Sequence, residues 1–141
     1  MKLIRTDEPI IARAFSFLWM HRVYVGRRFF ELPPNEQVAA LMHEEGHCVH
    51  RHTEQRVTCL LFLPFLLSWL CRRQEFEADR YSSQRGHSIA LLQILKGDFA
   101  GNFFTPSHRE RRERITLHHE QIRAAYVTGY FARPGVTGQG V

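Results

Sequence analysis

Apolar residues recur at helical spacing along most of the chain, with one short extended region near the start. After Asp7-Glu8-Pro9, which has the form of a helix start, the apolar positions between residues 10 and 19 predict a first helix. Residues 22–26 and 28–32 are rich in Val, Tyr and Phe, and they predict two short strands joined by a turn at Gly26-Arg27. We therefore expect a small β-sheet near residues 22–32.

Several further helices are predicted after this sheet, at about residues 35–51, 73–83 and 87–95, followed by a loop over 97–106. Asn35 can cap the first of these helices. The S-x-x-E sequence from Ser107 to Glu110 has the form of a capping box, so a last helix is expected from there to about Val127. The fold class that this pattern favours is α+β and mainly helical.

The length of the chain sets the expected domain organisation. A chain of 141 residues has the size of one domain with one modest core. We expect this domain to span residues 1–128. Residues 129–141 contain four glycines and one proline, which is typical of a mobile tail.

One stretch raises the question of a membrane. Between Arg56 and Arg72 lie 15 uncharged residues, Val57 to Cys71. As a helix they would reach about 22 Å, short of the hydrocarbon core of about 30 Å, and Pro64 interrupts them in the middle. Two interpretations stay open: a buried core segment, or a peripheral contact with a membrane surface, which the flanking arginines favour.

Composition narrows the class of protein. Hydrophobic residues make up 44% and charged residues 23%, which excludes global disorder. The formal net charge is +5, and all cations except Lys2 and Lys96 are arginines, so anionic partners are favoured. The three cysteines lack metal-type spacing and charged residues interrupt any leader-like start, so a cytoplasmic location, with a possible peripheral membrane contact, is expected.

The strongest chemical signal is His43-Glu44-Glu45-Gly46-His47, an H-E-x-x-H sequence inside a predicted helix. Residues four apart lie on one face of a helix, so His43 and His47 can bind one Zn²⁺ at about 2.0–2.1 Å each. Glu44 lies one step round the helix, where it can reach a water molecule and act as a general base. This pattern predicts one zinc ion per chain.

A zinc site of this kind needs a third protein ligand. His50 lies about 10.5 Å along the helix from His43, too far to share one ion. His52, His118 and His119 stay open as alternatives without a supporting pattern. Glu75 is the better candidate, because Asp79 follows it by one helical turn and can accept a hydrogen bond from the outer nitrogen of a zinc-bound histidine.

Three ordered motifs together resemble a known family. H-E-x-x-H at 43–47, E-F-E-A-D-R-Y at 75–81 and S-H-R-E-R-R-E-R-I at 107–115 resemble the motifs of the HtpX and CAAX-prenyl-protease family of gluzincin metallopeptidases. The resemblance implies a zincin-like fold, with His43, His47 and Glu75 as zinc ligands, Glu44 as general base and Asp79 as their hydrogen-bonding support. It also implies that His108 stabilises the oxyanion, and that Arg114 forms an ion pair with the helix that carries Glu75 and Asp79.

Two features differ from the family pattern. Arg109 replaces the proline that follows the histidine, and the membrane-spanning helices of the membrane-bound members are missing. The chain therefore looks similar to the minigluzincins, soluble minimal versions in which a terminal segment can cover the cleft and keep the enzyme latent. By this resemblance the tail at 129–141 could play that part, and the expected function is zinc-dependent cleavage of a peptide or protein substrate. A strand from 22–32 is expected to form the cleft rim.

Two other classes of function stay open. A basic nucleic-acid-binding or regulatory module would use the arginines of the last helix to contact phosphates. These arginines are Arg109, Arg111, Arg112, Arg114 and Arg123. Interleaved glutamates and the absence of a base-reading motif argue against nucleic acid as a partner. A metal-binding protein without turnover is the other class, but such a protein has no use for the general base Glu44.

Overall fold

A computed structural model of the chain describes the backbone of residues 2–131 and the side chains of residues 2–126. The chain begins with a three-stranded sheet of β1 (Lys2–Arg5), β2 (Ala12–Phe17) and β3 (Met20–Val25). The strand order is β1-β3-β2, with β1 parallel and β2 antiparallel to β3. The expected α+β class, mainly helical with a small sheet, is confirmed.

The helix predicted between residues 10 and 19 is wrong, because this stretch forms β2 and the turn after it. Its apolar residues do not share one buried face: Ser16 is buried, whereas Phe15 and Phe17 are exposed on either side of it. Alternate burial is the pattern of a strand, and the pairing with β3 satisfies the backbone groups. The turn places Leu18 at a φ of 54°, in the left-handed region.

The sheet also lies earlier in the chain than expected. Of the two strands predicted near residues 22–32, only the first exists, as part of β3. The second is replaced by the short helix α1 (Arg27–Phe30), which buries Phe29 and leaves Phe30 exposed. Gly26 is not a hairpin turn. A Cβ atom there would lie 2.4 Å from the carbonyl oxygen of Ile10, so the close packing of two backbone segments requires glycine.

Helices make up the rest of the described chain: α2 (Pro34–Val49), α3 (His52–Phe62), the 3-10 turn η1 (Pro64–Leu66), α4 (Leu67–Ser82), the π-helical turn η2 (Ser83–His87), α5 (Ser88–Ile94) and α6 (His108–Phe131). The capping box is confirmed, since the Ser107 amide donates to Glu110 Oε2 at 2.8 Å and the Glu110 amide donates to Ser107 Oγ at 3.2 Å. α6 continues past the expected end at Val127. Of the expected tail at 129–141, residues 132–141 lie outside the described residues.

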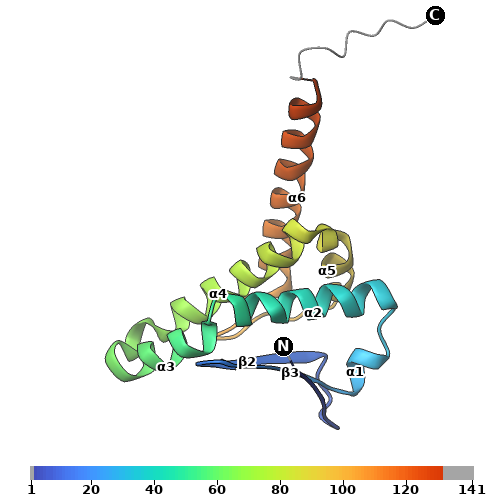
Figure 1. Ribbon diagram of the computed structural model, residues 1–141. Coiled ribbons are helices and arrows are strands. Elements are labelled where there is room, and N and C mark those ends of the chain that lie inside the picture. Colours follow the sequence, from blue (N-terminus) through green and yellow to red (C-terminus); the bar gives the residue numbers. More distant parts are fainter. Residues whose placement is uncertain (1, 132–141) are drawn as a thin grey trace, which may run out of the picture.

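The helix α2 is the central element of the fold. The sheet lies against one side of it and α4 runs beside it, while the C-terminal part of α6 projects away from the other elements (Figure 1). Ala40 and Cys48 of α2 pack with Val23 and Val25 of the sheet, and Ala39 packs into a second cluster formed with α5 and α6. The two faces of α2 are therefore buried in different halves of a small core.

Gly46 allows α2 and α4 to approach closely beside the H-E-x-x-H residues. A Cβ atom at Gly46 would lie 3.1 Å from both the Cα atom of Ala78 and the Cβ atom of Tyr81. Such a separation is shorter than ordinary carbon contacts of about 3.5–4.0 Å. The missing side chain thus brings the face of α4 that carries Glu75 and Asp79 next to His43 and His47.

The uncharged stretch 57–71 is not a core segment. It forms the end of α3, the turn η1 and the start of α4, which together make a helical hairpin whose tip points away from the sheet (Figure 1). The side chains of Phe62 and Phe65 are 75% and 76% exposed, so the core interpretation is wrong. Within residues 2–131, every helix is too short or too polar to cross a membrane.

Candidate metal centre

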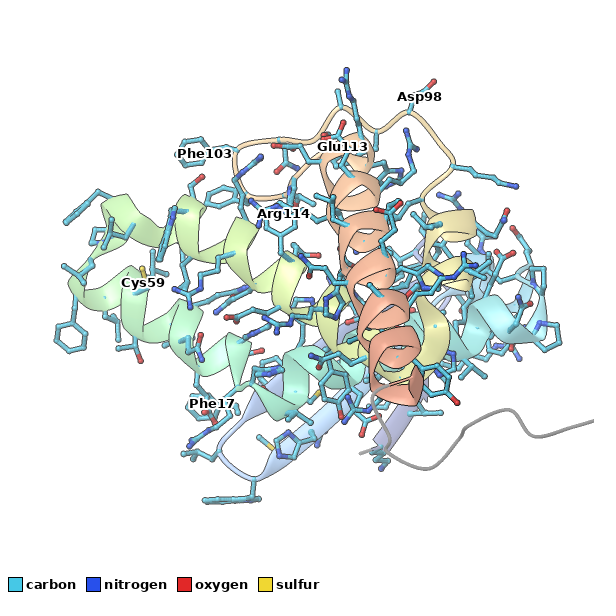
Figure 2. All side chains as sticks on the ribbon, turned by 90° about the horizontal axis from the view of Figure 1, so that it is seen from above. Phe17, Cys59, Asp98, Phe103, Glu113 and Arg114 are labelled. Atoms are coloured by element: carbon cyan, nitrogen blue, oxygen red, sulfur yellow. The ribbon has the colours of Figure 1, made fainter. Side chains whose placement is uncertain are left out.

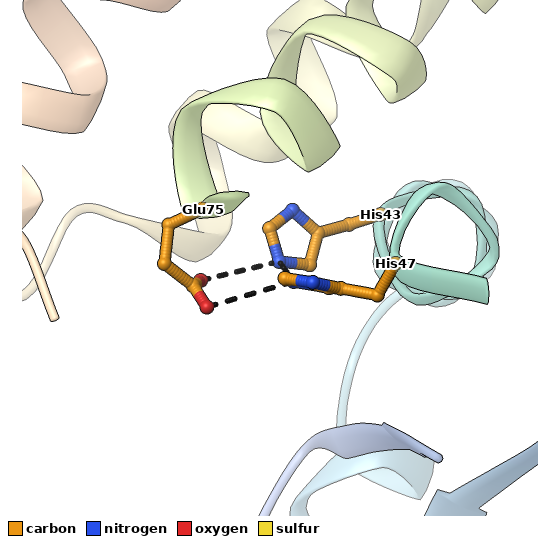
Figure 3. Close-up of side chains that lie close together, drawn as sticks. All are labelled: His43, His47 and Glu75. Atoms are coloured by element: carbon orange, nitrogen blue, oxygen red, sulfur yellow. Dashed lines mark hydrogen bonds and ion pairs between the residues drawn. The ribbon is translucent and has the colours of Figure 1, made fainter. Parts of the chain in front are cut away.

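His43, His47 and Glu75 converge from two helices on one point (Figure 3). His43 and His47 project from one face of α2, and Glu75 projects toward them from α4. The two Nε2 atoms are 3.2 Å apart. Glu75 Oε2 lies 3.5 Å from His43 Nε2, and Glu75 Oε1 lies 3.5 Å from His47 Nε2. All three side chains are at most 16% exposed.

These separations fit a bound metal ion. Two ligand atoms that each lie about 2.0–2.1 Å from a tetrahedral ion are about 3.4 Å apart, which is close to the three distances found here. Two imidazole nitrogens and a carboxylate are also a common donor set for a catalytic metal that keeps one position open. The buried group of His43, His47 and Glu75 can therefore hold a metal ion.

Asp79 and Arg111 orient His43 from behind. Asp79 Oδ1 lies 2.9 Å from His43 Nδ1, and Arg111 donates two hydrogen bonds to the Asp79 carboxylate, at 2.6 and 2.8 Å. Because Asp79 is held as an anion by Arg111, we assign the Nδ1 proton of His43 to this hydrogen bond. In the neutral form of the ring, that assignment puts the lone pair of His43 on Nε2, the atom that faces Glu75 and His47.

His52 and Glu77 play the corresponding part for His47. Nδ1 of His52 lies 2.7 Å from Nδ1 of His47, and Nε2 of His52 lies 3.2 Å from Glu77 Oε2. His52 is 1% exposed, and burial lowers its pKa to about 4, so its ring is neutral at neutral pH. In the arrangement of protons that fits both contacts, Nδ1–H of His47 donates to Nδ1 of His52, and Nε2–H of His52 donates to Glu77 Oε2. The lone pair of His47 then lies on Nε2, the nitrogen that faces the cluster.

The carboxylate of Glu75 is held in its charged form. Burial opposes ionisation, but the hydrogen bond from His43 and the nearby charges of both histidines and Arg111 lower its pKa well below its ordinary range. Arg56 Nη2 also lies 3.3 Å from Glu75 Oε1, and Arg111 Nη1 lies 3.6 Å from Oε2. Both oxygens therefore have a cation within reach, and Glu75 is ready to bind a metal without losing a proton.

His43 carries a proton in the metal-free chain. Burial lowers its pKa, but the hydrogen bond and charge of Asp79 outweigh burial and raise the pKa to about 9. Burial and the charge of His43 lower the pKa of His47 well below its ordinary value. The Nε2–H group of His43 therefore donates to His47 Nε2. This proton lies between two of the atoms that would bind the metal, so proton and metal compete for one place.

Glu44 lies beside the cluster and contacts the sheet. Its Oε2 atom accepts a hydrogen bond of 2.5 Å from the backbone amide of Ala14 in β2. Burial raises the pKa of Glu44 above its ordinary value, so this carboxylate is a stronger base than an exposed glutamate. Glu44 is half-buried and follows His43 directly in the chain.

Two residues expected at the site lie elsewhere. The ring of His108 hydrogen bonds to the carbonyl oxygen of Gly97 at 2.8 Å and packs against Phe99, so His108 does not face the cluster. Arg114 points from α6 toward α4, where its guanidinium lies 3.9 Å from the ring centre of Phe76 (Figure 2). The ion pair with the helix of Glu75 and Asp79, expected from Arg114, is made by Arg111, one helical turn earlier.

Among the described residues, the alternative third ligands His52, His118 and His119 are not part of the cluster. Nδ1 of His52 contacts Nδ1 of His47, which is the nitrogen of His47 on the side away from the cluster. His50 Nδ1 donates to the carbonyl oxygen of Gly46 at 2.8 Å. His118 lines a groove between α4 and α6. The sequence held no signal for Arg111 and Arg56, because arginines are frequent throughout the chain.

The edge of the sheet that faces the cluster belongs to β2, and not to the strand expected from 22–32. β3 is the central strand, so both of its edges are paired. Two amides along the free edge of β2 donate to side chains of α2 and α3: Ala14 to Glu44, and Ser16 to Thr53 at 3.2 Å. In the turn after β2, the Leu18 amide donates to Glu54 of α3. Any extended segment that pairs with this edge must displace these side chains.

Comparisons with known proteins add no further identification. A scan against protein-family models, a search of curated proteins and a search of solved structures each find no match to this chain.

Proposed function

We propose that this chain is a zinc-dependent endopeptidase of the gluzincin type, as its resemblance to the HtpX and CAAX-prenyl-protease family implies. The observation that carries the proposal is the combination of two features. The two Nε2 atoms of His43 and His47 lie 3.2 Å apart and each lies 3.5 Å from one oxygen of Glu75, and the neighbouring Glu44 has a pKa raised by burial. A site that only holds a metal needs no such glutamate.

The chain's own residues divide the work of hydrolysis. His43, His47 and Glu75 would hold the ion, which when bound supplies Lewis acidity to a water molecule and to the scissile carbonyl. Glu44 takes the proton of the attacking water and delivers it to the leaving amine. Asp79 and His52 keep the two imidazoles in the tautomers that leave Nε2 free.

The free edge of β2 is the proposed binding site for the peptide. It runs beside Glu44, and its outward amides already donate hydrogen bonds to side-chain oxygens in place of a peptide. An extended substrate can exchange these partners for its own carbonyl groups and lie across the cluster. Glu44 and Thr53 accept the hydrogen bonds of these amides in the structure, so a substrate has to displace both side chains before it can pair with β2.

The arrangement of the arginines supports a peptidase over a nucleic-acid-binding module. Arg111 is bound to Asp79, Arg109 pairs with Glu113 at 3.0 Å, and Arg112 donates to the carbonyl oxygen of Leu95. These side chains already have partners within the chain. These three arginines of α6 therefore do not form a row of basic groups directed to phosphates.

The test compares zinc content and peptide cleavage in three full-length proteins: wild type, Glu44→Gln and Glu45→Gln. Glu45 is the matched control, because it lies on the same helix next to Glu44 and is not a member of the His43-His47-Glu75 group. We expect all three to bind one zinc per chain, and only Glu44→Gln to lose casein cleavage. Equal cleavage by all three proteins, or zinc binding without cleavage by any, would contradict the proposed activity and favour a metal-binding protein without turnover.

A further inference from the structure

We propose that the tip of the α3–α4 hairpin is a docking surface for an anionic lipid membrane. The apolar tip is defined here by its exposed large side chains: Leu60, Leu61, Phe62, Leu63, Phe65, Leu66 and Trp69. This inference is independent of the proposed peptidase activity, because it rests on a different part of the molecule.

The exposed side chains of the apolar tip are neighbours in the chain. Leu61, Phe62 and Phe65 are 70%, 75% and 76% exposed, and all lie within five residues of one another. Single exposed apolar side chains are common on protein surfaces, but a contiguous group marks a place that another apolar phase covers. Such a group in water opposes solubility unless it has a partner.

A neighbouring loop extends the same surface. Ser68 in the first turn of α4 hydrogen bonds to the carbonyl oxygen of Phe103, which brings the loop after α5 beside the hairpin (Figure 2). Phe103 is 72% exposed and Phe104 is 45% exposed. Two segments 35 residues apart in the chain therefore present phenylalanine side chains at one end of the molecule.

The position of the apolar tip favours a lipid surface. η1 closes the hairpin at Pro64, and the hairpin forms one end of the molecule (Figure 1). Phe62, Leu63, Leu66 and Trp69 line a hollow between α3 and α4, whereas Leu60, Leu61 and Phe65 lie outside it. Residues 60–62 form the last turn of α3, about 5 Å long, which matches the depth of about 5–10 Å that interfacial elements reach in a bilayer. The surface is suited to shallow insertion.

Two exposed arginines stand behind the apolar tip. Arg51 and Arg73 are 61% and 59% exposed, and each also pairs with a nearby glutamate, Glu54 and Glu77. The other two arginines of this region, Arg56 and Arg72, pair with Glu75 and Glu110. The guanidinium of Arg73 lies 5.5 Å from the ring centre of Trp69. Trp beside Arg at the base of an apolar group is the arrangement that places an aromatic ring at the level of lipid headgroups.

Vesicle flotation of the full chain tests the proposal. The probes are vesicles of phosphatidylcholine alone and vesicles of phosphatidylcholine with phosphatidylserine. The variant is Phe62→Ser with Phe65→Ser, and the control is Trp19→Ser, an equally exposed apolar residue in the β2–β3 turn. All three replaced side chains are exposed, so the variants are expected to fold, which circular dichroism checks.

We expect flotation with the phosphatidylserine vesicles, a loss of binding of about tenfold or more in the double variant, and no loss in the control. Fluorescence of Trp69 in a Trp19→Phe background should shift to shorter wavelength on binding. No flotation, or equal losses in variant and control, would overturn the proposal. So would concentration-dependent self-association that the double variant abolishes without any vesicle binding, because a second copy would then be the partner.

Discussion

Nδ1 of His47 and Nδ1 of His52 lie 2.7 Å apart in the interior of the chain. Two ring nitrogens at this distance require one proton between them, so the tautomer of one ring determines that of the other. His52 is in turn within 3.2 Å of Glu77 Oε2, which favours its Nε2–H form. His52 is thus placed to hold His47 in the form that binds a metal.

Replacing His52 should weaken the metal site without removing a ligand. We expect His52→Leu to lower zinc affinity about 10–100-fold, because the outer nitrogen of His47 loses its acceptor. His52→Asn is the matched control, since its Oδ1 atom can accept the same proton. Competition with a chelator measures both affinities, and equal losses in the two variants would show that packing alone explains the effect.

The ion pair of Arg111 with Asp79 should be important for stability as well as for the site. Both side chains are nearly buried, at 12% and 3% exposed, so Arg111→Met leaves the Asp79 charge without its main partner. We expect a loss of about 3–5 kcal/mol in the free energy of unfolding, measured by urea titration.

Arg109→Met is the control for this change. Arg109 is 83% exposed and pairs with Glu113 on the same helix, so a loss of less than about 1 kcal/mol is expected. A loss of stability as large as that of Arg111→Met would contradict the special role of the buried Arg111–Asp79 ion pair, because an exposed arginine of α6 would then matter equally.

Metal binding should release a proton and strengthen as the pH rises. In the metal-free chain His43 has a pKa of about 9, whereas the metal requires its neutral ring. Below pH 9 the proton must leave, so zinc affinity should rise about tenfold per pH unit and level off above pH 9. His47 is already neutral and Glu75 already ionised, because their pKa values are lowered, so neither adds a proton.

Calorimetry in buffers of different ionisation enthalpy measures this release directly. At pH 7.5 we expect about one proton to leave for each zinc bound. The same titration of Glu45→Gln should give the same number, since Glu45 is not part of the cluster. Binding without proton release would mean that the proton is absent from His43 in the metal-free chain.

Gly46→Ala should disturb the site through the distance between two helices. The added Cβ would approach Ala78 Cα and Tyr81 Cβ to 3.1 Å, so α4 must move away from α2. We expect a loss of about 1–3 kcal/mol in stability and a lower zinc affinity, because Glu75 moves with α4. Gly97→Ala is the control, since its nearest neighbour would be His108 Nδ1 at 4.0 Å. Equal effects of both changes would contradict the role given to the close helix approach.

The candidate ligands were predictable because they belong to local helical patterns. His43 and His47 are one turn apart on a helix, as are Glu75 and Asp79, and helical spacing alone places each pair on one face. The helices themselves follow from apolar periodicity and, for α6, from the capping box. All of these signals extend over fewer than ten residues, so the sequence contains them in full.

The remaining features depend on contacts between distant segments. Residues 12–17 form a strand because β3 is available to pair with them, although their spacing also suits a helix. Arg111 and Arg114 are one turn apart on α6, and only the packing of α6 against α4 decides which of them reaches Asp79 and which lies over Phe76. Sequence spacing sets what one helix can present on its own face, but the partner that meets this face is chosen by tertiary packing.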